Sequence, residues 1–324
     1  MRFALTWTDA TLRRVRDVTP SIRVFEIVPA GGRALPYSVG SHINVSVLVG
    51  GQPDTRSYSL VGEGSGESYR IAVKRQPESR GGSSYMWGLK EGAKLSVTEP
   101  HALFTLEYDR PEYLLVAGGI GITPIVGMAL QLARRHAPVR MLYAARTRDD
   151  LAFLDELAPV LGERLELYVS AEGRRIDLAS EFGRLPPGAM AAICGPLPMI
   201  DAARRAWAEA GRPSPDLRFE TFGSSGSRPP EPFRVRLAGQ DREILVPETR
   251  TMLAALEDAG IEVISDCLRG ECGLCALDIV AIDGEVDHRD VFFSDEQRAE
   301  NGKICTCVSR AVGTITVDVL YRPD

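Results

Sequence analysis

The sequence lacks a long apolar run. None of its 324 residues falls in a stretch that approaches the roughly 18 consecutive apolar residues needed to cross a bilayer. Its first ten residues, MRFALTWTDA, hold no continuous apolar core of a secretion signal. We therefore expect a cytoplasmic protein that neither spans nor is anchored to a membrane.

The sequence also lacks the residues of hydrolytic catalysis. It has four histidines, and nothing in their spacing suggests a Ser/His/Asp arrangement or a metal that activates water. We interpret each of them as structural or exposed rather than catalytic. They are His42, His101, His136 and His288.

A basic surplus is missing as well. The formal net charge is −6, and residues 233–324 hold 18 acidic against 10 basic residues. Nucleic acid is therefore disfavoured as a partner, because phosphate binding needs a basic surface. An acidic carboxyl-terminal module fits a basic docking partner or simply a solvated surface.

Cysteine is scarce but clustered. A disulfide framework is typical of short secreted chains, which this chain does not resemble. The spacing C-x4-C-x2-C is that of plant-type ferredoxins, and Gly270 and Gly273 allow a tight turn that aims backbone N–H groups at sulfur. Zinc is disfavoured because structural zinc sites pair two C-x2-C or C/H knuckles. We predict a [2Fe–2S] cluster on Cys267, Cys272, Cys275 and either Cys305 or Cys307.

The pattern of apolar residues changes twice along the chain. Short extended segments between Gly/Pro-rich turns come first and predict an antiparallel β-barrel. Strands that alternate with helices, one of them over residues 149–161, then predict a parallel α/β domain. A Gly/Ser/Pro-rich linker leads to an α+β module. The predicted fold is multidomain, with a barrel at 1–109, an α/β domain at 110–223, a linker at 224–232 and the α+β module at 233–324.

Two segments of the predicted barrel suit a flavin phosphate. Glycines and serines ahead of a helical stretch supply backbone N–H groups and hydroxyls, and Arg56 adds a charge-assisted bond. Tyr58 is placed to lie against a ring and Ser59 to face a flavin nitrogen. The candidate flavin-binding residues are Arg56, Ser57, Tyr58, Ser59, Val73, Lys74, Arg80, Gly81, Gly82, Ser83 and Ser84.

Two segments of the α/β domain suit a nicotinamide dinucleotide, although the common G-x-G-x-x-G fingerprint is absent. A glycine-rich turn after an apolar strand opens a helix, whose N-terminus favours a pyrophosphate. Arg146 and Arg148 follow the next strand, where the adenosine ribose is expected. The candidate nucleotide-binding residues from this pattern are Gly118, Gly119, Gly121, Thr123, Pro124 and Arg146, and resemblance to a known family adds Cys194, Gly195, Pro196 and Phe222.

These motifs, in this order, resemble the ferredoxin–NADP reductase superfamily, with its R-x-Y-S, G-G-x-G-x-T-P and C-G-P motifs. The Arg-Gly-Gly-Ser-Ser segment resembles the FMN-binding branch typified by phthalate dioxygenase reductase, so FMN is expected rather than FAD. Cys307-Val-Ser-Arg-Ala and Asp287-His-Arg-Asp resemble class IA aromatic-ring oxygenase reductases. The resemblance implies a β-grasp ferredoxin module, Cys307 as the fourth ligand, and Ser59, Cys194 and Phe222 as residues at the hydride-transfer site.

The resemblance also implies a function. A flavin accepts two electrons from NADH and releases them singly to a two-iron cluster, so it belongs between them. The expected protein is an NADH-dependent reductase that passes electrons through FMN and the cluster to a Rieske-type oxygenase docked near the cluster. The alternatives are reduction of a cytochrome P450 or another redox partner, and a flavin/iron–sulfur redox sensor.

Overall fold

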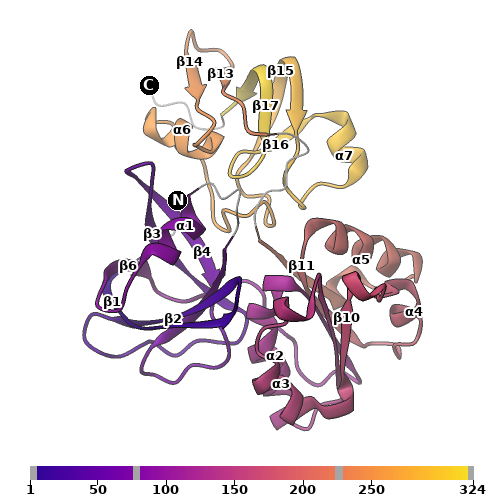
Figure 1. Cartoon of the computed structure of the whole chain (residues 1–324). Helices are drawn as coiled ribbons and strands as arrows, with labels where there is room; N and C mark the ends of the chain where they lie inside the picture. The colour runs from indigo at the N-terminus through magenta and orange to yellow at the C-terminus, as the bar shows by residue number, and fades with distance from the viewer. Residues whose placement is uncertain (1–5, 76–80, 223–228, 320–324) are drawn as a thin grey trace. The chain divides into compact units, whose positions relative to one another are not determined.

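The computed structural model describes residues 6–75, 81–222 and 229–319. The chain divides into two compact units, Leu5–Thr221 and a unit of Met1–Ala4 with Phe222–Asp324. Figure 1 follows the elements of both units along the chain. In the described residues no helix is long and apolar enough to cross a membrane.

The first sheet of the larger unit is antiparallel and has the order β4-β3-β6-β1-β2-β5, with β7 paired to β3. A bridge between Leu60, just after β4, and Ile71 on β5 joins the two edges, so the sheet closes into a barrel. Alternate residues such as Ile43, Val45 and Val47 fill its core. The strands are β1 (Trp7–Thr19), β2 (Ile22–Pro29), β3 (Ser41–Val49), β4 (Gln52–Ser59), β5 (Tyr69–Lys74), β6 (Lys94–Thr98) and β7 (His101–Ala102), and helix α1 is Gly82–Gly88.

The second sheet of this unit is parallel, in the order β10-β9-β8-β11-β12. Helices α2 and α3 cover one face and α4 and α5 the other (Figure 1), which explains why β8 and β11 are apolar and buried throughout. The elements are β8 (Tyr113–Gly118), α2 (Ile122–Arg134), β9 (Val139–Ala145), α3 (Leu154–Leu161), β10 (Leu165–Val169), α4 (Leu178–Gly183), β11 (Met190–Gly195), α5 (Leu197–Glu209) and β12 (Leu217–Thr221).

The helix predicted over residues 149–161 begins later, at Leu154. Residues 148–150 form a 3₁₀ turn, and Phe153 adopts a left-handed conformation with φ of 61°. Asp150 in this turn accepts hydrogen bonds from Lys74 and Ser21 of the barrel, both at 3.0 Å. The turn therefore joins the α/β domain to the barrel, and tertiary contacts override the local helical pattern.

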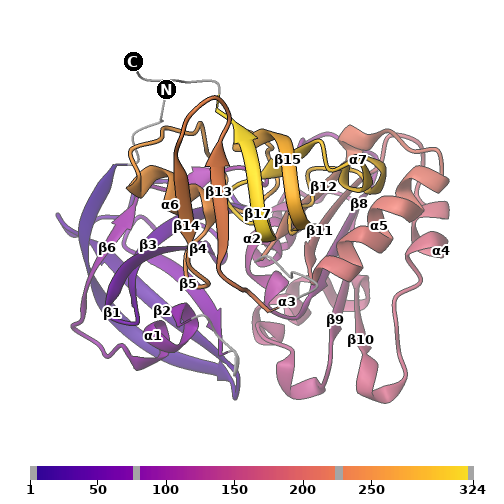
Figure 2. The same cartoon turned by 90° about the horizontal axis from the view of Figure 1, so that it is seen from above.

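The smaller unit contains a five-stranded mixed sheet of the order β14-β13-β17-β15-β16, with β13 and β17 parallel. Figure 2 shows β14, β13, β17 and β15 side by side. Helix α6 begins where Thr251 Oγ1 accepts a hydrogen bond from the Ala254 N–H at 3.1 Å, and its apolar face joins the core of the sheet. This arrangement agrees with the predicted α+β ferredoxin module.

Two short elements of this unit escaped the sequence analysis. They are α7, which begins with a capping box at Ser294, and β16, which ends at Cys305. The elements of the unit are β13 (Phe233–Leu237), β14 (Glu243–Val246), α6 (Met252–Asp258), β15 (Ala276–Asp287), α7 (Asp295–Glu300), β16 (Lys303–Cys305) and β17 (Arg310–Asp318).

Candidate functional site

A cradle for a phosphate group lies where α1 begins. Gly81 precedes the helix with φ of 91°, a conformation that favours glycine. A Cβ added to Gly82 would come within 2.6 Å of Arg56 Nε, so the guanidinium lies directly against the helix start. Ser83 Oγ is buried and has no hydrogen-bond partner within the described residues. These groups suit a phosphate. The Arg56 guanidinium supplies positive charge, and the Ser83 hydroxyl and the first backbone N–H groups of the helix supply hydrogen-bond donors.

The other predicted flavin residues have protein partners. Arg56 forms an ion pair with Asp54 at 2.7 Å, which a phosphate must share or displace. Tyr58 is half-buried, and burial raises its pKa above the usual value. Ser84 is exposed, and Ser57 donates to Asn44.

Two further predicted flavin-binding residues, both on β5, also contact other protein groups. Val73 is part of the barrel core, and its carbonyl accepts the Trp87 indole N–H at 3.1 Å. Lys74 is paired with Asp150. The predicted ligand Arg80 lies outside the described residues.

A buried hydrogen bond joins the barrel to the parallel sheet. Ser59 Oγ at the end of β4 donates to Glu220 Oε2 on β12 at 2.7 Å, and the two residues are 4% and 0% exposed. Cys194 on β11 is the register partner of Glu220. The structure thus brings Ser59 and Cys194 to one region and adds Glu220, which the sequence analysis missed. Its one sequence signal is an acidic residue that follows Phe219 near the end of a predicted strand.

The two nucleotide motifs pack against each other. A Cβ on Gly121 would lie 2.2 Å from the Cys194 carbonyl oxygen, and one on Gly118 would lie 2.7 Å from Pro196 Cδ. Only glycine permits this approach. The motifs follow β8 and β11, the neighbours between which the strand order reverses, and open α/β sheets bind ligands at that switch point. Thr123 Oγ1 donates to the Ile120 carbonyl at 3.0 Å and holds the glycine turn.

The remaining predicted nucleotide residues lie near the edges of this domain. Arg146 is exposed just after β9. Arg148 is paired with Glu172 through two hydrogen bonds, at 2.6 and 2.8 Å. Phe222 follows β12 at the start of the smaller unit, and 36% of its surface is exposed.

The cysteine loop of the smaller unit directs backbone N–H groups at sulfur. The N–H groups of Arg269 and Glu271 both donate to Cys267 Sγ, at 3.4 Å. Gly270 and Gly273 have φ of 73°, and a Cβ on Gly273 would meet the Phe292 ring at 2.3 Å. The loop thus has the N–H···S geometry expected around cluster thiolates.

The thiols of this loop and of the segment after β16 are in contact. Cys267 accepts hydrogen bonds from Cys272 and Cys307, which hold its pKa well below the usual value. Cys275 accepts from Cys305 and Cys307, which lower its pKa to about 3. In the described residues no three His, Cys, Asp or Glu side chains form a site for a single metal ion. A two-iron cluster does not need three ligands around one metal ion, because each iron binds only two of the four thiolates.

The segment that holds the two later cysteines is a turn. An extended segment would place both side chains on one face, but the strand ends at Cys305 and Ser309 N–H bonds back to the Cys305 carbonyl at 2.9 Å. Thr306 caps the Cys275 carbonyl through its N–H at 3.2 Å and its hydroxyl at 2.9 Å. The turn brings Cys307 back toward both Cys267 and Cys275, whereas Cys305 contacts Cys275.

The Asp287–Asp290 segment supports this loop. Asp290 accepts hydrogen bonds from Ser309 Oγ at 2.9 Å and the Phe293 N–H at 3.0 Å, and Val291 N–H donates to the Gly270 carbonyl. Burial opposes the ionised form of Asp290, but the nearby His288 ring, 3.6 Å away, and these hydrogen bonds lower its pKa.

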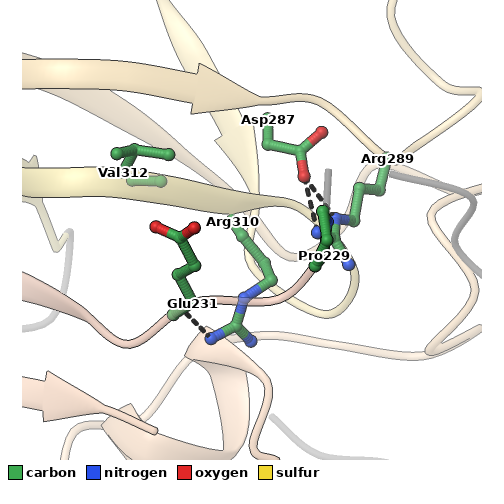
Figure 3. A pocket seen from close by; sticks show the side chains of 7 residues that line it. Pro229, Glu231, Asp287, Arg289, Arg310 and Val312 are labelled. Carbon is green, nitrogen blue, oxygen red and sulfur yellow. Dashed lines mark hydrogen bonds and ion pairs between the residues drawn. The ribbon is translucent and has the colours of Figure 1, made fainter. Parts of the chain in front are cut away.

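A small hollow beside this segment anchors the chain that enters the unit. Asp287 and Arg289 form a buried ion pair at 2.6 Å on one side of it. Arg310 donates to the Glu231 carbonyl at 3.0 Å on the other side (Figure 3), and to the carbonyls of Pro247 and Arg250. These contacts bind protein groups, so we interpret the hollow as structural.

Two family models match parts of the chain. The 2Fe-2S iron-sulfur cluster binding domain matches residues 235–312, and the oxidoreductase NAD-binding domain matches residues 115–205. The carnitine monooxygenase reductase subunit of Escherichia coli is 33% identical, with 94% of this chain and 96% of that protein covered. The heme-dependent oxidative N-demethylase beta subunit of Ectopseudomonas mendocina is 36% identical, with 95% and 97% covered.

Solved structures show that the similarity includes the fold. An intact type IV self-sufficient cytochrome P450 monooxygenase matches with a TM-score of 0.68 and 34% identity, over 96% of this chain and 41% of that one. Phthalate dioxygenase reductase, described as a modular structure for electron transfer from pyridine nucleotides to [2Fe-2S], matches with a TM-score of 0.81 and 31% identity over 97% of this chain and 98% of that one. The chain therefore belongs to the phthalate dioxygenase reductase-like family of NADH-dependent oxidoreductases, which carry FMN and a carboxyl-terminal [2Fe–2S] domain.

Proposed function

We propose that this protein is the reductase component of a Rieske-type oxygenase system, with electrons passing from NADH through FMN and the [2Fe–2S] cluster to the oxygenase. The observation that carries the proposal is the near-complete coverage by phthalate dioxygenase reductase together with the intact cysteine loop. We retain the domain limits 1–109, 110–223, 224–232 and 233–324 as part of it. The strand limits support this division, because the barrel strands end at Ala102, the parallel sheet spans Tyr113–Thr221 and the third sheet begins at Phe233.

The phosphate of FMN binds in the cradle of Arg56, Gly81, Gly82 and Ser83. The orphaned Ser83 hydroxyl and the close packing of Arg56 on Gly82 support this assignment. Bound FMN would convert the two-electron transfer from NADH into two one-electron transfers. The protein's part is to hold the phosphate, and through Tyr58 to shield the ring.

Hydride transfer takes place beside Ser59, Glu220 and Cys194. Ser59 presents its hydroxyl at the flavin, and Glu220 orients that hydroxyl through the 2.7 Å hydrogen bond. The turn of Gly118, Gly119 and Gly121 holds the pyrophosphate next to the Cys194–Pro196 segment, so the nicotinamide reaches the flavin at the switch point of the sheet. Phe222 covers the flavin where the nicotinamide must enter.

NADH is the preferred donor. One of the two arginines that follow β9, Arg148, is held by both oxygens of Glu172, which leaves fewer cations for a 2′-phosphate. Arg146 remains to contact the adenosine ribose from its exposed position.

Cys267, Cys272, Cys275 and Cys307 hold the cluster. The turn at 306–308 supports Cys307, because it directs this thiol toward two of the other ligands. The oxygenase docks near the cluster, where Leu274 and Phe292 are 52% and 44% exposed. The acidic excess of residues 233–324 favours a basic partner surface.

A heme enzyme is the second candidate partner. Relatives of this chain include a subunit of a heme-dependent N-demethylase and the reductase part of a self-sufficient cytochrome P450. The chemistry within this chain is the same for either partner, because both accept single electrons.

The partner is tested with purified acceptors. A Rieske-type oxygenase and a cytochrome P450, each stripped of its own reductase, are mixed anaerobically with this protein and NADH, and reduction of each is followed by absorption. We expect rapid reduction of the Rieske centre and slow reduction of the P450. Faster reduction of the P450 would transfer the assignment to a heme partner, and NADH oxidation without reduction of either would contradict both.

Replacement of Arg56 tests the phosphate cradle. Arg56→Ala removes charge-assisted hydrogen bonds worth about 1.5–3 kcal/mol, so FMN should bind about tenfold or more weakly. Flavin retained through gel filtration and the dissociation constant measured by fluorescence quenching report the change. Arg16→Ala, on an exposed position of β1, is the matched control. Unchanged affinity in Arg56→Ala would remove Arg56 from the phosphate site.

Paired serine substitutions identify the fourth cluster ligand. Cys307→Ser should lose most of the bound iron and sulfide and the EPR signal of the reduced cluster, because serine is a poor ligand for this cluster. Cys305→Ser, two residues away, should keep both. The reverse result would make Cys305 the ligand and would show that the turn at 306–308 rearranges around the metal.

A further inference from the structure

The smaller unit holds one thiol more than a two-iron cluster needs. Its cysteines are Cys267, Cys272, Cys275, Cys305 and Cys307, whereas such a cluster takes four thiolates. With Cys307 as the fourth ligand, Cys305 is left over. Its side chain is 0% exposed, so it is neither a surface residue nor one that solvent reaches. A buried thiol beside the ligands therefore has a role to be explained.

Backbone pairing fixes Cys305 beside Cys275. Cys305 is the last residue of β16 and the register partner of Ala276, the first residue of β15. Thr306 follows and donates two hydrogen bonds to the Cys275 carbonyl, from its N–H at 3.2 Å and from its hydroxyl at 2.9 Å. The two cysteines are thus held together by strand pairing and by Thr306, independently of any contact between their sulfurs.

The thiol of Cys305 donates a hydrogen bond to the sulfur of Cys275. A buried free cysteine behaves as a small apolar side chain with a weak S–H donor. Cys275 is only 2% exposed, so water scarcely competes for its sulfur. At Cys267 the corresponding donors are the backbone N–H groups of Arg269 and Glu271. Two ligand sulfurs therefore receive hydrogen bonds from the protein, one from backbone and one from a side-chain thiol.

A donor at a ligand sulfur changes the reduction potential of an iron–sulfur cluster. The reduced cluster carries one more negative charge than the oxidised cluster, and part of that charge lies on the ligand sulfurs. A hydrogen bond donated to sulfur therefore stabilises the reduced state more than the oxidised state. The effect is larger in a buried site, because the local dielectric constant is low.

We propose that Cys305 is a positioning residue that acts through Cys275 and raises the reduction potential of the cluster with its S–H···S hydrogen bond. Cys305 binds no iron, and its S–H bond does not break. The electron comes from the flavin and leaves to the partner, so no further reactant takes part. The inference rests on the proposed function, because that function makes Cys275 and Cys307 ligands and leaves Cys305 as a thiol.

The proposal is tested by redox titration of the holoprotein. Cys305→Ala removes the donor and keeps a small apolar side chain. The protein is titrated anaerobically with redox mediators, and the EPR amplitude of the reduced cluster gives its midpoint potential. Where the wild-type cluster is half reduced, the ratio of reduced to oxidised cluster should fall about threefold in the variant, a midpoint about 30 mV more negative. Iron and sulfide content should match the wild type.

Three further variants separate the donor from the packing. Cys305→Ser keeps a donor and should recover part of the shift. Cys305→Val is a second variant without a donor, should match Cys305→Ala, and replaces it if the alanine variant does not fold. Ile304→Val trims a side chain that is also 0% exposed, on the same strand, and removes no donor, so the midpoint should keep its wild-type value.

Exchangeable protons give a readout that packing alone does not change. The S–H proton exchanges with deuterium during incubation in D₂O, whereas protons on carbon do not. Pulsed EPR spectra of the reduced wild-type cluster, compared between H₂O and D₂O, should show an exchangeable proton coupling that is missing from Cys305→Ala and Cys305→Val. Ile304→Val should keep this coupling.

The possible failures are distinguishable. A wild-type midpoint and an unchanged exchangeable coupling in both variants without a donor, with iron retained, would overturn the proposal. Loss of iron from both would make Cys305 a ligand and would overturn the proposal together with the ligand assignment of Cys307. A wild type that gives no EPR signal of a reduced cluster would overturn the proposed function itself.

Discussion

The carboxylate of Glu220 is wholly buried, and burying a charged or polar group is costly unless it is hydrogen-bonded. Its bond from Ser59 at 2.7 Å therefore does two things. It fixes β4 of the barrel against β12, the last strand of the parallel sheet. It also holds the Ser59 hydroxyl next to Cys194, the register partner of Glu220. The proposed hydride-transfer site depends on this contact, because the proposed flavin cradle and the proposed nucleotide turn come from different sheets.

Close backbone packing completes the same region. Gly121 lies so near the Cys194 carbonyl that any side chain there would collide with it. On the helix that follows, a Cβ on Gly127 would come within 2.5 Å of the Gly62 carbonyl of the barrel. Glycine is thus required twice, once to let the turn after β8 pack on the end of β11 and once to let the barrel approach helix α2. The cysteine loop uses glycine for a third purpose, to turn N–H groups toward sulfur.

Features that depend on neighbours in the chain were predictable from the sequence. The cysteine spacing, the glycine turn after β8 and several strand limits, such as Val139–Ala145, follow from local patterns. Features that depend on distant packing were not. Glu220 reads as one acidic residue in a strand until Ser59 is placed against it. The histidines appear scattered along the chain, and only the register of β3 with β7 brings His42 to His101. The turn after Cys305 has no signature in the sequence, because it depends on the hydrogen bond from the Ser309 N–H to the Cys305 carbonyl.

In the proposed function, electrons from NADH reach the cluster only through FMN. Freshly purified protein is titrated anaerobically with NADH, followed by visible absorption and low-temperature EPR, and the released flavin is identified by chromatography. We predict release of FMN, bleaching of both chromophores and a rhombic EPR signal from the reduced cluster. A reduced flavin without any cluster signal would contradict the electron path, because the thiols would then hold a different group or none.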